Sequence, residues 1–335
     1  MSSIRGKILV TGATGLIGKA IVSRLYDINK DVGNIEIYAQ IRNEDKARRL
    51  FSKKKGVKFL ASDIAEVDLV NLGIDYVIHC ASVTDSKSFV YSPVETIMTS
   101  IEGTKRILEF SRINHVKSLV YLSSMEVYGA PVTDEKIDEK HGTNIDTSCA
   151  RSSYPESKRM CETLCTAYYN EFEVPVKTLR LTQTFGPGVN YNDGRVFAEF
   201  ARCAIEGKNI VLNTKGTTKR NYLYIDDAVN AILTVLLYGD NGEIYNVANE
   251  ETYCSIYQMA ELVAKNCSEK EINVIINEGD NVERGYAPTL NMNLDTSKIR
   301  ALGWCPKVGL KEMYLKMIAD MRNQVGNSYG DKENY

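Results

Sequence analysis

The chain of 335 residues lacks several features that mark particular classes of protein. Its net charge of -2 gives no basic footprint, which argues against nucleic acid or an anionic membrane surface as a partner. It has no run of eighteen apolar residues, so we expect no membrane-spanning helix. Residues 1–6 are short and polar and run into an apolar strand, which predicts no signal peptide.

Cysteine and histidine are arranged in ways that argue against common sites. None of the eight cysteines forms a CxxC pair, and Cys161 and Cys165 lie four residues apart on a predicted helix, a poor spacing for zinc. The three histidines are scattered, so we expect no metal site. Scattered cysteines in a chain of this length are typical of a reducing compartment, which predicts a cytoplasmic protein.

What the chain does have is a glycine-rich turn at Thr11–Gly18, directly after the apolar run Lys7–Val10. An amphipathic helical pattern follows, so the turn brings backbone N–H groups and a helix N-terminus against a phosphate pair. The spacing is GxxGxxG rather than the commoner GxGxxG, and an ordinary strand–turn–helix corner is the alternative. The residues expected at a dinucleotide are Gly12, Thr14, Gly15, Leu16, Ile17 and Gly18.

Strand-like runs alternate with helical patterns through the first half of the chain. This rhythm predicts an α/β fold, a doubly wound parallel Rossmann sheet with a smaller C-terminal α/β substrate lobe. The strands are expected at 7–10, 35–41, 57–60, 75–79, 118–122 and 176–181, with helices at 94–113 and 155–172. We predict a dinucleotide domain at 1–185, to which 220–248 returns, and the lobe at 186–335, with residues from Asn323 onward frayed.

Two charged residues follow the second and third predicted strands. Arg42 stands where an acid would bind the ribose hydroxyl of NAD, and an arginine can fork onto a 2′-phosphate. NADP(H) is therefore favoured and NAD(H) possible, with a solvated arginine as the alternative. Asp63 could accept a hydrogen bond from an adenine amine, or could be a helix N-cap or loop acid.

A third group of residues predicts a reaction centre. Ser124 ends the fifth strand, and Lys158 lies one helical turn beyond Tyr154 on the same face. An ammonium and a cationic nicotinamide would favour the phenolate, and lowering a phenol pKa by about three units requires roughly 4 kcal/mol. Tyr154 then acts as base or acid, while Ser124 polarises the reacting oxygen.

These motifs together resemble an extended short-chain dehydrogenase/reductase, the NAD-dependent epimerase/dehydratase family that modifies nucleotide sugars. The resemblance runs along nearly the whole chain, through Thr11–Gly18, Asp63, Asp75–Ser82, Gly103-Thr104, Ser123–Gly129, Tyr154 with Lys158, Arg180–Pro187, Lys219–Asp226, Tyr245–Ala248, Arg284 and Leu302–Trp304. It implies a cofactor on the first domain, Lys158 on the nicotinamide ribose, and Arg220 and Arg284 on the nucleotide diphosphate. We also expect Ile64, Cys80, Ala81 and Ser82 at the cofactor, and Gln183 and Arg195 at the substrate.

The chain departs from the family pattern at several positions. Ser100 and Gln183 stand where asparagine is common, and Met125 stands where some dehydratases have an aspartate. Glu126 remains, and a single positioned carboxylate suffices as a base. A solvated acid at a strand end is the alternative for Glu126.

The favoured interpretation is an NADPH-dependent reductase of a keto nucleotide sugar, serving cell-surface polysaccharide precursors. The alternatives are an epimerase, 4,6-dehydratase or decarboxylase with retained NAD(P), and a non-catalytic dinucleotide sensor. The resemblance also implies a homodimer through the helices 94–113 and 155–172. The candidate seam, which could instead face the chain's own sheet, comprises Ile97, Ile101, Ile107, Leu108, Met160, Leu164 and Tyr168.

Overall fold

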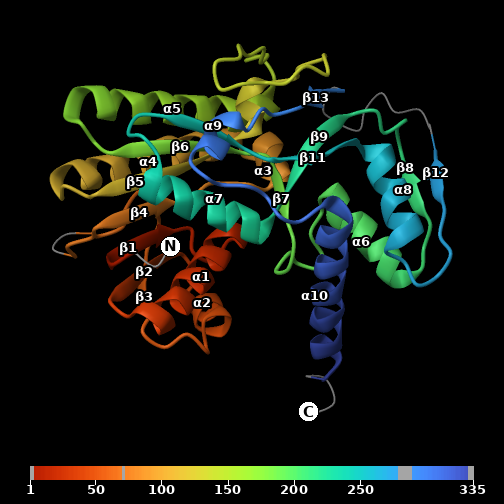
Figure 1. The fold of residues 1–335 in the computed structure, drawn as a ribbon, viewed down its shortest axis with the longest axis horizontal. Coiled ribbons are helices and arrows are strands. Elements are labelled where there is room, and N and C mark those ends of the chain that lie inside the picture. The colour runs from red at the N-terminus through yellow and green to blue at the C-terminus, as the bar shows by residue number, and fades with distance from the viewer. Residues whose placement is uncertain (1–3, 70–71, 278–288, 331–335) are drawn as a thin grey trace.

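A computed structural model describes residues 4–69, 72–277 and 289–330 of the chain. Figure 1 shows a larger part, built of a sheet with helices on both of its faces, beside a smaller lobe. No helix within the described ranges is long and apolar enough to cross a membrane.

The larger part is organised around a seven-stranded sheet in which every neighbouring pair is parallel. This confirms the predicted Rossmann-type α/β fold. In spatial order the strands are β10 (Ile244–Val247), β6 (Val176–Leu181), β5 (Ser118–Ser124), β4 (Tyr76–His79), β1 (Gly6–Thr11), β2 (Ile35–Ile41) and β3 (Lys58–Ala61). The chain winds outward in opposite directions from β1 and β4, so ligands are expected where the carboxyl ends of these two strands meet.

Helices cover both faces of this sheet because its strands are apolar on both sides. On β1, Ile8 and Val10 pack into one core and Leu9 into the other. The first core lies under α1 (Leu16–Val32), α2 (Glu44–Leu50), α7 (Ile225–Tyr238) and α9 (Ser297–Ala301). The second lies under α4 (Pro93–Ile113) and α5 (Ser153–Phe172), and α3 (Ser86–Tyr91) packs beside them.

In its described residues the lobe is built from two small sheets and three helices, seen on the right of Figure 1. One sheet contains β7 (Gln183–Phe185), β9 (Lys219–Tyr224), β11 (Asn249–Ser255) and β13 (Asn291–Met292); the other pairs β8 (Ile210–Leu212) with β12 (Val274–Ile276). The helices are α6 (Val196–Glu206), α8 (Ile256–Asn266) and α10 (Leu310–Gly330). From residues 220–248, α7 and β10 join the large part, whereas β9 belongs to the lobe.

One expectation about the helices is wrong, and the predicted dimer seam is wrong for two of its residues. Helix α10 continues past Asn323, where fraying was predicted, because Gln324 accepts from the Tyr191 N–H at 3.0 Å and donates to the Val189 carbonyl at 2.8 Å. In the predicted dimer seam, Ile107 and Leu108 are fully buried in the chain's own core. Of the remaining seam residues, Ile101, Leu164 and Tyr168 pack partly against that core, whereas Met160 is 49% exposed.

Candidate active site

The glycine-rich turn lies at the carboxyl end of β1 and packs closely against neighbouring backbone. Gly12 has φ +61°, and a Cβ there would lie 2.8 Å from the Ala81 Cα. At Gly18 a Cβ would lie 2.4 Å from the Gly12 carbonyl oxygen, so only glycine lets α1 approach the turn. Gly15 caps α1 without a side-chain hydrogen bond, and the first turn of α1 has no acid. The turn and the helix N-terminus therefore fit a pyrophosphate.

A buried side-chain relay connects this turn to β4 and α4. The Thr11 Oγ1 accepts the N–H groups of Cys80 and Ala81, each at 3.1 Å, and lies 2.7 Å from His79 Nδ1. Because Thr11 Oγ1 already accepts two N–H groups, its hydroxyl donates a hydrogen bond to His79 Nδ1. The ring proton of the neutral His79 is then on Nε2, 3.2 Å from Thr104 Oγ1. Burial lowers the pKa of His79 to about 3 and raises the pKa of Cys80 to about 12, so both are neutral and shape the wall beside the turn.

The ends of β2 and β3 are connected through Gln40 rather than through an acid. Its Oε1 accepts the Gly12 N–H at 3.0 Å and its Nε2 donates to the Ser62 carbonyl at 2.6 Å. Asp63 Oδ1 accepts the Ala65 N–H at 3.0 Å, so this carboxylate stabilises its own loop, and its role at an adenine stays a prediction. Ile64 is buried against Gly103.

Arg42 and Ser82 line a cavity of about 350 Å³ between the end of β2, the loop after β4 and α4. Hydroxyl side chains of that loop and of the helices α3 and α4 also line the cavity, as do the carboxylates of Asp85 and Glu95. Ser82 in its wall directly follows Ala81, which lies against Gly12 of the glycine turn, and the polar lining would suit the adenosine end of a dinucleotide.

The predicted reaction centre assembles where β5 ends and α5 begins. The Tyr154 ring is buried and stacks on Phe89 with a centroid distance of 4.3 Å, and its hydroxyl hydrogen-bonds with Ser124. Lys158 is buried, and its Nζ donates to the Leu122 carbonyl at 2.8 Å, 5.9 Å from the centroid of the Tyr154 ring.

The charge balance at Tyr154 runs opposite to the direction predicted from the sequence. Burial, followed by the nearby Glu126, raises the pKa of Tyr154, and the hydrogen bond with Ser124 and the charges of Arg151 and Arg195 offset this only in part. Burial likewise lowers the pKa of Lys158, whose ammonium bonds to the backbone of β5. The residues of the chain by themselves therefore hold Tyr154 as a neutral phenol.

The 3-10 turn η1 (Met125–Tyr128) directs two consecutive side chains differently. Met125 is buried, and its sulfur accepts from the Thr182 hydroxyl at 3.3 Å, so it packs in the core. Glu126 lies within electrostatic reach of Tyr154 and pairs with Arg151, with 3.2 Å from Oε2 to Nη1. The Ser124 hydroxyl accepts the backbone N–H of Glu126 at 3.2 Å, which caps η1 and fixes the backbone of Glu126 beside the reaction centre.

Arg151 is the residue of this centre that the sequence analysis missed. It lies on η2 (Ala150–Ser152), directly before α5, and its side chain is 33% exposed. The only signal in the sequence is its position three residues before Tyr154, which would not distinguish it from a solvated arginine.

The lobe contributes polar groups to the same region. Arg220 Nη1 donates to Gln183 Oε1 at 3.3 Å, and the Arg220 Nε is buried without a partner, as expected of a group that awaits an anionic ligand. Arg195 begins α6 and acts electrostatically on Tyr154, but its guanidinium holds both carboxylate oxygens of Asp193. Arg284 lies outside the described residues.

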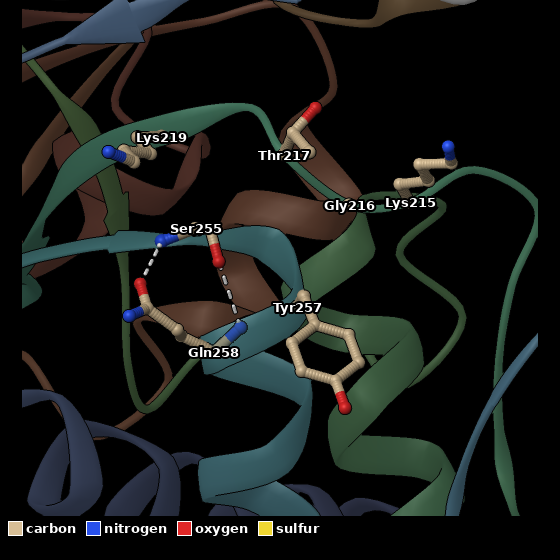
Figure 2. Close-up of a pocket in the computed structure, with 7 residues that line it drawn as sticks. All are labelled: Lys215, Gly216, Thr217, Lys219, Ser255, Tyr257 and Gln258. Atoms are coloured by element: carbon tan, nitrogen blue, oxygen red, sulfur yellow. Dashed lines mark hydrogen bonds between the residues drawn. The ribbon is translucent and has the colours of Figure 1, made fainter.

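A second cavity, of about 340 Å³, lies on the lobe at the N-terminus of α8 (Figure 2). Ser255 and Gln258 form a reciprocal capping pair there, seen as the two dashed lines in Figure 2. Lys219 from β9 lines the cavity and pairs with Asp134 at 2.8 Å. None of the predicted site residues lines this cavity, which therefore plays no part in the reaction centre.

Comparison with known proteins agrees with this geometry. Residues 8–248 match the NAD dependent epimerase/dehydratase family. The chain is 28% identical over 321 residues to UDP-glucuronic acid decarboxylase 5 of Arabidopsis thaliana, which covers 96% of this chain and 90% of that protein.

Two solved structures share the fold. A UDP-N-acetylglucosamine 4-epimerase from Methanobrevibacter ruminantium, in complex with UDP-N-acetylmuramic acid, superposes with a TM-score of 0.83 at 20% identity, over 96% of this chain and 99% of that one. A UDP-glucuronic acid 4-epimerase from Bacillus cereus, in complex with NAD, gives 0.74 at 22% identity, over 95% and 99%. The chain is thus an enzyme of the NAD-dependent epimerase/dehydratase family.

Proposed function

We propose that the protein modifies a nucleotide-diphosphate sugar by hydride transfer with a retained cofactor, and that its reaction is the decarboxylation of a UDP-hexuronic acid. The observation that carries this proposal is the place of Glu126, whose backbone bonds to Ser124 and whose carboxylate acts electrostatically on Tyr154, where the family's sugar would react. The similarity over almost the full length to a UDP-glucuronic acid decarboxylase supports it. It replaces the reductase as the favoured hypothesis.

The chemistry follows from the arrangement of these groups. The positive charge of a bound oxidised nicotinamide would favour the phenolate form of Tyr154. The phenolate takes the proton of the sugar's 4-hydroxyl as the hydrogen on that carbon leaves as hydride, and Ser124 holds the oxygen. The resulting ketone lies β to the carboxylate, so the bond to the carboxyl carbon breaks, CO2 leaves and the electron pair forms an enolate. A water oriented by the Glu126 carboxylate delivers a proton from solvent to the ring carbon, so one proton is taken up for each CO2 released. Tyr154 returns its proton to the oxygen as the ketone is reduced.

A bound nicotinamide dinucleotide supplies the hydride acceptor and donor. The glycine turn and the N-terminus of α1 would hold its pyrophosphate, and Cys80, Ala81 and Ser82 would contact it after β4. Arg42 still predicts a preference for NADP(H), whereas the Bacillus cereus relative was solved with NAD. Thermal shifts of the protein with each dinucleotide decide this, and an Arg42→Ala variant should lose any preference for the 2′-phosphate.

We also propose a homodimer, whose interface is formed by more exposed residues of the helices α3, α4 and α5 than those predicted from the sequence. Tyr91, Val94, Met98 and Met160 on α3, α4 and α5 are 82%, 72%, 42% and 49% exposed, and an apolar group of this kind favours association. Sedimentation should give a dimer at micromolar concentration that a Val94→Glu/Met160→Glu variant disrupts. A monomeric wild-type protein would contradict the proposal.

The proposed reaction is tested by identifying its products. Protein supplied with UDP-glucuronic acid should release CO2 and a UDP-pentose, which mass spectrometry distinguishes from the starting acid. Formation of an isomeric UDP-hexuronic acid without CO2 would identify an epimerase instead. Consumption of NADPH with a 4-keto nucleotide sugar, and no reaction with the acid, would restore the reductase hypothesis.

A further inference from the structure

The electrostatics at Tyr154 single out three charged side chains. Glu126 disfavours the phenolate, and Arg151 and Arg195 favour it, so all three lie within electrostatic reach of the hydroxyl. They come from three separate elements, η1, η2 and the start of α6. Arg151 and Arg195 are the two cations, and they differ in how many of their N–H groups are already hydrogen-bonded.

Arg195 is already occupied by its own chain. Its Nε and Nη2 bond to Asp193 at 3.0 and 2.6 Å, and its guanidinium lies 4.7 Å from the centroid of the Phe197 ring. Within the part of the chain that the structure describes, Arg151 makes one side-chain hydrogen bond, from Nη1 to Glu126 at 3.2 Å. A guanidinium carries five N–H donors, so Arg151 retains the planar fork that a carboxylate accepts.

We propose that Arg151 receives the carboxylate of the sugar, and so selects hexuronic acid nucleotides over neutral hexose nucleotides. This inference rests on the proposed function, because it supplies the group that would recognise the substrate's acid. Arg151 is then a specificity-determining residue, beside the proton-transferring pair Tyr154 and Glu126.

The pairing with Glu126 explains how two carboxylates can share the site. An unpaired Glu126 would repel an entering sugar acid, whereas its pairing with Arg151 brings the local charge close to zero. The guanidinium can bind the second carboxylate through its remaining N–H groups and stay between the two acids. Once CO2 has left, the product no longer holds this contact, which favours its release.

The backbone around Arg151 is fixed independently of its side chain. The Ser152 hydroxyl donates to the Asp146 carbonyl at 2.6 Å, and the Ser153 hydroxyl donates to the Phe89 carbonyl at 2.9 Å. Phe89 in turn stacks on Tyr154. Replacing the Arg151 side chain should therefore leave η2 and the tyrosine in place.

The test compares two ligands that differ only at the sugar's sixth carbon, UDP-glucuronic acid and UDP-glucose. Calorimetry on the cofactor-loaded protein in a Tyr154→Phe background, where turnover is blocked, should show that Arg151→Met weakens binding of the acid by about tenfold to a hundredfold, the range for one charge-assisted hydrogen-bonded pair. UDP-glucose should bind within about threefold of wild type by the same argument. Arg151→Lys, which keeps the charge but loses the fork, should show an intermediate loss.

The matched control is Arg159→Met, on α5 directly after Lys158. Arg159 also pairs with a glutamate, Glu156 at 3.1 Å, but it does not contribute to the charge balance at Tyr154. It should leave the affinities for both ligands unchanged. Equal losses for the two ligands in Arg151→Met, or no loss for either, would overturn the inference.

The outcomes separate this inference from the proposed function. If wild type releases CO2 but Arg151→Met discriminates between the ligands as wild type does, only the role of Arg151 is wrong. If wild type prefers the acid through Arg151 but releases no CO2, only the decarboxylation is wrong.

Discussion

The cofactor half and the substrate half of this molecule satisfy their polar groups differently. Beside the glycine turn, the side chains of Thr11, His79, Thr104 and Gln40 bond to one another or to backbone and form a closed network. In the lobe, Arg220 keeps a buried Nε without a partner. A site that always binds the same cofactor can have its polar side chains fully hydrogen-bonded within the protein. A site that binds varied sugars depends on a few side chains whose hydrogen-bonding groups are still unpaired before the ligand arrives.

The same contrast divides the reaction centre. Tyr154, Ser124 and Lys158 are held by stacking and by backbone hydrogen bonds, whereas Glu126 and Arg151 meet through one ion pair between partly exposed side chains. Surface ion pairs contribute little to stability, so this pair is free to rearrange around a substrate. We infer that reaction type is fixed by the first group and substrate choice by the second.

The largest effect is expected for Tyr154→Phe, in the fixed part of the centre. The ring can keep its stacking on Phe89, so the fold and cofactor affinity should persist, while turnover falls by about a thousandfold because the proton acceptor is gone. Steady-state turnover and dinucleotide binding measure the two quantities separately. Turnover within tenfold of wild type would show that Tyr154 is not the acid or base.

Next in size is Arg220→Met, which tests whether the lobe binds only the substrate. Loss of a cation on the nucleotide diphosphate should raise KM for the nucleotide sugar by about tenfold to a hundredfold. Dinucleotide affinity should not change, because Arg220 lies on β9 and bonds to Gln183. A parallel loss of cofactor affinity would show that the two halves are not separate in the way described.

The smallest effect concerns the pH dependence of the closed network. The pKa of His79 is about 3 in the folded protein, below the ordinary value of 6.5, so the unfolded chain takes up a proton first as the pH falls. The contribution of neutral His79 to the free energy of unfolding is therefore fully present above pH 6.5 and is lost as the pH falls toward 3. Between pH 7 and pH 5 this loss lowers the free energy of unfolding by about 2 kcal/mol. Urea unfolding at both pH values should show a smaller difference for His79→Gln than for wild type. An equal difference would contradict this account.

Features encoded over short stretches of sequence could be predicted. The strand Lys7–Val10 with its glycines, and the Tyr154–Lys158 turn, each carry their signal within about a dozen residues, because strand period and helix spacing are local properties. The six predicted strands of the large sheet all occur in the structure.

Features set by tertiary packing could not be predicted. The sequence places Lys158 one turn from Tyr154 but does not show that its ammonium bonds to the Leu122 carbonyl, or that burial and Glu126 raise the pKa of the phenol. Likewise, Ile107 and Leu108 have the spacing of an exposed seam yet lie in the core. Arg151 meets Glu126 across 25 residues, and nothing local marks the pair.

The central claim is that one sugar is oxidised and then reduced in the same site. The most direct test is to count CO2 released from UDP-glucuronic acid while following the absorbance of the reduced nicotinamide. We predict many molecules of CO2 per protein with no net change in reduced cofactor. One reduced cofactor formed or consumed for every product would contradict the account.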